Sequence, residues 1–110
     1  MNYKEQMHEL NIQIEQAEQK GLVPKELYLK QIELLKIAHD EFIQTATKKG
    51  YDLNTNLDIM EIEIKQFSAM KQVAQKINLP TKEYDNAIYS VRVRVLGEET
   101  VKQHFYPSSK

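Results

Sequence analysis

Two of the three histidines have acidic neighbours with which they could bind a metal ion or exchange protons. His39 precedes Asp40 and Glu41, and His8 lies next to Glu9. Metal sites on helices need several ligands on one face, commonly four residues apart, and no His-Glu-x-x-His motif occurs. We therefore predict that these imidazoles lie at the surface or at the boundary of the core, and that the protein holds no metal ion.

Carboxylate pairs recur along the chain, as at Glu61 with Glu63 and at Glu98 with Glu99. Acid–base catalysis needs two carboxyl groups that share a pocket and whose surroundings drive their pKa values apart. Residues one or two positions apart on a helix do not face each other, so we expect these pairs to lie on solvated faces. The chain has no cysteine, no serine in a nucleophile-elbow motif and no glycine-rich phosphate loop. We predict a non-enzymatic protein without a cofactor.

Composition argues against several broad classes of partner. The 15 basic and 16 acidic residues give a net charge of −1, so global charge does not favour nucleic acid or a membrane surface. No apolar run approaches the roughly 20 residues that a membrane helix needs, and the first residues lack the apolar core of a signal peptide. We expect a cytoplasmic protein whose 110 residues form a single domain, 1–110, that does not contact a membrane.

The three glycines mark the ends of predicted helices, because glycine adopts a left-handed cap without steric cost. Between them, apolar residues recur at spacings of three and four, which predicts helices over about 3–20, 24–49 and 57–78. A fourth helix is predicted between Thr81 and Gly97. The predicted core stripes are Tyr3, Met7, Leu10, Ile14, Ala17; Tyr28, Ile32, Leu35, Ala38 or His39, Phe42, Ala46; Met60, Ile64, Phe67, Met70, Ala74, Ile77; and Tyr84, Ile88, Val91, Val95.

These segments predict an all-α, bundle-like fold. Residues 3–49 form a helical hairpin, because the link between its two helices is short. Residues 57–106 form a second part, with a third long helix and a C-terminal helix pair. The C-terminal region has an alternative, since Tyr89 to Val95 alternate like a strand, and a β-hairpin at about 88–106 would then replace the last helices. We favour helix, because the start and stop signals agree.

Additional apolar residues on the second helix point to a protein partner. Leu27, Leu34 and Ile37 lie off the core stripe, and a helix with apolar residues on several sides is covered on several sides. We therefore expect a small regulatory or adaptor protein that acts by helix-mediated protein–protein interaction and forms homo-oligomers. Aromatic and aliphatic anchors dominate such interfaces, so the predicted contact residues are Tyr28, Leu34, Ile37 and Phe42.

The alternative is a DNA-binding transcriptional regulator of the helix-turn-helix type. Residues 73–95 place a small residue, a turn and apolar anchors at the spacing of that motif. Seven basic and four acidic residues give residues 70–110 a charge of +3, whereas eight and twelve give residues 1–69 a charge of −4. Acidic side chains at the start of the second helix argue against this function, because they repel phosphates. The predicted nucleic-acid contacts are Lys82, Asn86, Arg92 and Arg94.

Overall fold

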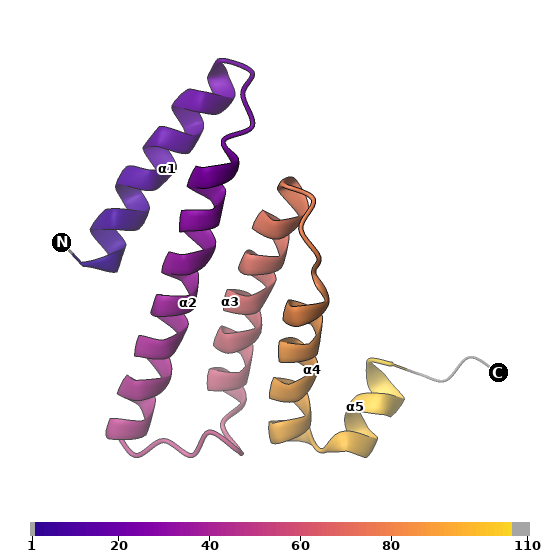
Figure 1. Cartoon of the computed structure of the whole chain (residues 1–110). Helices are drawn as coiled ribbons and strands as arrows, with labels where there is room; N and C mark the ends of the chain where they lie inside the picture. The colour runs from indigo at the N-terminus through magenta and orange to yellow at the C-terminus, as the bar shows by residue number, and fades with distance from the viewer. Residues whose placement is uncertain (1, 107–110) are drawn as a thin grey trace.

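The computed structural model describes residues 2–106 and contains five helices in this range (Figure 1). Helices account for 79% of the described residues, which contain no strand. The all-α, bundle-like prediction is confirmed, and the alternative β-hairpin at about 88–106 is not supported, because that segment is helical. The helices are α1 (Tyr3–Gln19), α2 (Lys25–Lys48), α3 (Leu57–Lys76), α4 (Lys82–Leu96) and α5 (Glu98–His104).

Local capping explains several of these boundaries. The Asn2 side chain accepts a hydrogen bond from the backbone N–H of Glu5, and the Asn56 side chain accepts one from Ile59, so two helix N-termini are satisfied. Thr81 occupies the N-cap position of α4 without a side-chain cap bond. Gly97 separates α4 from α5 with φ +89°, a conformation that L side chains rarely adopt.

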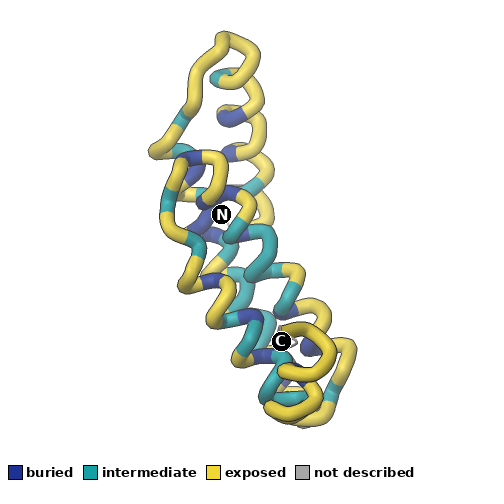
Figure 2. The backbone as a smooth tube through the Cα atoms, turned by 90° about the vertical axis from the view of Figure 1, so that its right-hand side faces the viewer, coloured by how far each residue is buried: buried dark blue, intermediate teal, exposed yellow. Residues whose placement is uncertain are grey.

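The helices lie in one layer, in the order in which they occur along the chain. Each packs against its sequence neighbours: α1 on α2, α2 on α3, α3 on α4, and α4 on α5. Figure 1 shows α1 to α4 side by side, with α5 turned away at the end of α4, and Figure 2 gives the view from the α5 side. The molecule measures 47 × 43 × 16 Å, so it is much thinner than it is long or wide.

A layer of this shape exposes more surface than a compact monomer does. The radius of gyration is 16.3 Å, against about 13 Å for a compact domain of this length. The accessible surface is 7708 Å², whereas a compact protein of this mass exposes about 6,300 Å². The faces of the layer are therefore open.

The core follows the contacts between neighbouring helices. Every residue of the predicted stripes is buried or half-buried, so these stripes are confirmed. Tyr28 donates a hydrogen bond from its hydroxyl to Glu18 of α1. The ammonium group of Lys76 lies 5.4 Å from the centre of the Tyr28 ring. This hydrogen bond, with burial and the negative charge of Glu18, raises the pKa of Tyr28 to about 12. The main cluster comprises Leu10, Ile14, Tyr28, Ile32, Leu34, Met70, Val73, Ala74, Ile77 and Tyr84.

Candidate functional site

A buried ion-pair cluster joins α2, α3 and α4. Glu63 of α3 is only 2% exposed, and its carboxylate accepts a hydrogen bond from the guanidinium group of Arg94 on α4. The other carboxylate oxygen lies 2.9 Å from Nε2 of His39 on α2. Arg94 also donates from Nε to the carbonyl oxygen of Leu53, at 3.0 Å, and the His39 ring packs on Phe67 with 4.6 Å between ring centres. The cluster thus fixes three helices and one loop relative to each other.

Two opposing effects act on the pKa of the Glu63 carboxyl. Burial raises this pKa, but hydrogen bonds from His39 and Arg94, together with their positive charge, hold it below its ordinary value. Glu63 is therefore ionised at neutral pH, and its charge is compensated inside the layer.

The prediction that Glu63 lies on a solvated face is wrong. The predicted stripe of this helix ran from Met60 through Ile64, which is only half-buried. The spacing through Glu63 is stricter, because Met60, Glu63, Phe67 and Met70 follow each other at three, four and three residues. That spacing is the signal that places a carboxylate on the buried face. His39 lies at the core boundary, as predicted.

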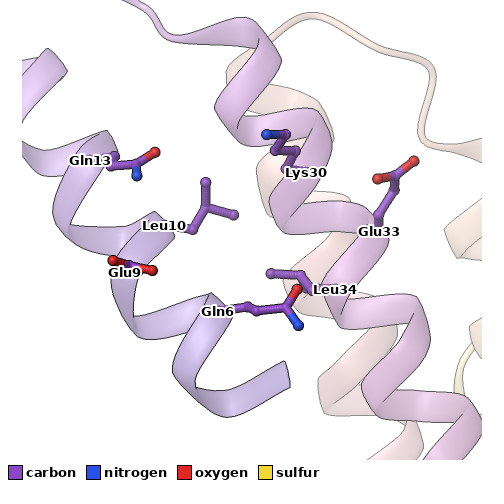
Figure 3. Close-up of a pocket in the computed structure, with 7 residues that line it drawn as sticks. All are labelled: Gln6, Glu9, Leu10, Gln13, Lys30, Glu33 and Leu34. Carbon is purple, nitrogen blue, oxygen red and sulfur yellow. The ribbon is translucent and has the colours of Figure 1, made fainter. Parts of the chain in front are cut away.

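A groove of about 290 Å³, here called the α1–α2 groove, lies between α1 and the N-terminal half of α2 (Figure 3). Leu10 and Leu34 point towards each other from the two helices and form its apolar floor. The other lining side chains are polar or charged, so the groove offers an apolar strip with hydrogen-bonding edges. They are Gln6, Glu9 and Gln13 of α1 and Lys30 and Glu33 of α2.

A second pocket, of about 330 Å³, lies where α2 and α3 meet at the loop between them. We call it the α2–α3 pocket. Two of its side chains are substantially exposed, Tyr51 of the loop at 53% and Ile62 of α3 at 40%. Most of the remaining lining is apolar or uncharged, with one cation and one anion. The full lining is Phe42, Thr45, Ala46, Lys49, Tyr51, Asn56, Asp58, Ile59 and Ile62.

α1 is shorter than α2 and lies along only part of the side of α2 that faces away from α3 (Figure 1). The contacts from α1 reach the N-terminal half of α2, through the amide of Gln31, which donates to Asn11 at 2.8 Å, and the groove at Leu34. Figure 1 shows that α1 does not extend along the remaining part of α2. No residue of α1 lines the pocket. The C-terminal half of α2 therefore lacks a neighbour on that side within residues 2–106.

The four predicted protein contacts lie at different places along α2. Tyr28 is buried in the core, and Leu34 forms part of the floor of the α1–α2 groove. Ile37 is 45% exposed about one turn further along the helix. Phe42 is half-buried and lines the α2–α3 pocket. The structure thus places these side chains in the core, in each of the two concave surfaces and, for Ile37, at an exposed position outside both, and does not gather them into one patch.

The predicted nucleic-acid contacts are also divided. Lys82 and Asn86 are exposed in the first turns of α4. The guanidinium carbon of Arg92 lies 4.1 Å from the centre of the Phe105 ring, a cation–π geometry. Arg94 is engaged by Glu63 in the buried cluster. Of the four predicted contacts, only Lys82 and Asn86 are therefore exposed and free of an ion pair or ring contact among residues 2–106.

The helices of the predicted 73–95 motif lie alongside each other. Figure 1 shows α3 and α4 side by side and running in opposite directions, whereas helix-turn-helix motifs cross at roughly 90–120°. Asp85 forms an ion pair with Lys71 of α3 at 2.7 Å, and Glu83 forms one with Lys36 of α2 at 3.4 Å, so both acidic residues of the first turn of α4 are paired with other helices.

Comparison with known proteins gives no match to this chain among family models, curated proteins or solved structures. Within residues 2–106, no group of three or more histidine and acidic side chains is arranged to hold a metal ion. In the same range, no helix has the length and apolar character needed to cross a membrane. The open layer and its two concave surfaces are the features of the molecule that indicate a function.

Proposed function

We propose that this chain is a small, non-enzymatic regulatory or adaptor protein that acts through helix-mediated contacts with other proteins and associates with itself. The observation that carries the proposal is the single layer of helices. Domains bury their apolar faces between packed layers of secondary structure, and residues 2–106 provide one layer. A layer supplied by another polypeptide would complete the arrangement.

The exposed area supports this proposal quantitatively. The accessible surface of 7708 Å² exceeds that of a compact monomer by about 1,400 Å². Each partner in a standard protein–protein interface buries about 800 Å². The excess is therefore large enough for one such interface.

Helix α2 is the element through which we expect partners to bind. It contributes Lys30, Glu33 and Leu34 to the α1–α2 groove and Phe42, Thr45 and Ala46 to the α2–α3 pocket. Concave surfaces with apolar floors accept the apolar side of a partner helix. A cytoplasmic location is part of the proposal.

The DNA-binding alternative has weaker support. Arg94 already pairs with a buried carboxylate, and Glu83 and Asp85 add negative charge at the start of α4. Phosphate contacts at that helix terminus would have to overcome this charge.

Co-purification tests the proposed self-association. A tagged and an untagged copy of the full chain are produced together, and the tagged copy is captured on an affinity resin. We expect the untagged copy to be retained in a comparable amount. Recovery of the tagged copy alone, with a helical circular dichroism spectrum for both copies, would contradict the proposal.

A further inference from the structure

We propose that the α2–α3 pocket is the contact surface of a two-fold symmetric homodimer. This inference rests on the proposed self-association and specifies where it occurs. The occupant of the pocket is a second copy of this chain, contacting it through the same residues.

The pocket combines a cavity with an aromatic side chain at its rim. Tyr51 is 53% exposed, and its backbone N–H donates to the carbonyl oxygen of Ala46 at 3.1 Å, so the position of the residue beside α2 is fixed. A volume of about 330 Å³ is enough for an aromatic ring next to Phe42 and Ile62. In a two-fold pair, the Tyr51 ring of each copy enters the pocket of the other. Tyrosine is enriched among the residues that dominate binding energy at interfaces.

The charges of the pocket complement each other under two-fold symmetry. Lys49, at the C-terminal end of α2, and Asp58, in the first turn of α3, both line it. Neither forms an ion pair within residues 2–106. A two-fold axis through the pocket brings Lys49 of each copy towards Asp58 of the other, which gives two equivalent ion pairs. A second copy therefore already carries the charges that this surface requires.

The layer as a whole exposes enough surface for one interface of this kind. The pocket lies between the C-terminal end of α2 and the first turns of α3, next to the exposed Ile62 and Leu57 of α3. The layer exposes about 1,400 Å² more than a compact monomer, against the roughly 800 Å² that each partner of a stable dimer buries.

Charge reversal and mixing test this arrangement. Lys49→Glu and Asp58→Lys each replace two attractive contacts by two repulsive ones, so each variant alone should dimerise about tenfold more weakly, as measured by light scattering over a range of concentrations. In a mixed dimer of the two variants, the new glutamate of one copy faces the new lysine of the other, and the unchanged Asp58 and Lys49 form the second pair. The mixture should regain the affinity of the wild type.

Two further variants complete the experiment. Lys48→Glu makes the same change of charge one residue outside the pocket and should leave the dimer intact. Tyr51→Ala removes the rim aromatic from an exposed loop and should weaken the dimer by at least tenfold. Circular dichroism verifies that all variants remain folded.

The outcomes separate this inference from the proposed function. A wild-type chain that is monomeric at every concentration overturns both. A dimer that is indifferent to the Lys49, Asp58 and Tyr51 variants overturns the pocket as its site and leaves self-association standing. Weakened single variants that fail to recover on mixing refute the two-fold pairing.

Discussion

Replacing Arg94 by methionine should destabilise the protein far more than its position near the end of α4 suggests. The substitution preserves an apolar stem of similar length and removes the guanidinium group. Glu63, at 2% exposure, would then keep only the hydrogen bond with His39. The hydrogen bond to the carbonyl oxygen of Leu53 would also be lost.

The magnitude follows from the burial of the two partners. Breaking a buried ion pair by removing one partner costs about 3–5 kcal/mol. The Arg94 side chain is 30% exposed, and water can replace part of its interaction, so we take the lower end, about 3 kcal/mol. A domain of this size has a total stability of about 5–15 kcal/mol. The melting temperature should accordingly fall by roughly 10–20 °C.

Urea unfolding at neutral pH, followed by circular dichroism, measures this loss. Arg92→Met is the matched control, because Arg92 lies on the same helix and contacts only the exposed Phe105 ring among the interactions found for it. Its loss should be about 0.5–1 kcal/mol. If Arg94→Met is as stable as Arg92→Met, the cluster does not hold the three helices together, and the reasoning fails.

Three further predictions concern pH and nucleic acid. The pKa of Glu63 in the folded protein is below its ordinary value of 4.5, so the ionised carboxylate stabilises the fold above pH 4.5. This stabilisation is lost as the pH falls through the pKa of the folded protein. The difference in unfolding free energy between wild type and Glu63→Gln should therefore shrink in acid. Folding raises the pKa of Tyr28 from 10.0 to about 12, so the Tyr28 hydroxyl stabilises the fold below pH 10 and this stabilisation is lost towards pH 12. Tyr28→Phe should lower the free energy of unfolding by about 1 kcal/mol at neutral pH. In urea titrations the variant should then lose less stability than the wild type as the pH is raised. Fluorescence anisotropy should detect no binding to duplex DNA whose affinity falls steeply with salt. A steep dependence of DNA affinity on salt that Lys82→Ala and Asn86→Ala reduce would support the DNA-binding alternative.

The helices were predictable because their signals are local. The predicted 3–20 and the observed Tyr3–Gln19 differ by one residue, since Gly21 ends the apolar repeat. The strand-like alternation near Tyr89 did not prevail, because Tyr84, Ile88 and Val91 form a buried helical stripe of α4, which packs against α3.

The arrangement of the helices was harder to predict, because it depends on contacts distant in the sequence. The periodicity shows that α1 has an apolar face, but it does not show that this face meets α2 alone. Ile37 and Phe42, both predicted as contacts, lie apart because a spacing of five residues turns their side chains about 140° from each other around α2. Glu63 was missed because carboxylates rarely lie in a core, and its partners come from two other helices.

Sedimentation equilibrium of the wild-type chain tests the central claim most directly, namely that this open layer is completed by a second copy. We predict a mass that rises with concentration towards twice 12.9 kDa. A mass that stays at 12.9 kDa throughout, for a chain whose circular dichroism shows it to be folded and helical, would contradict it.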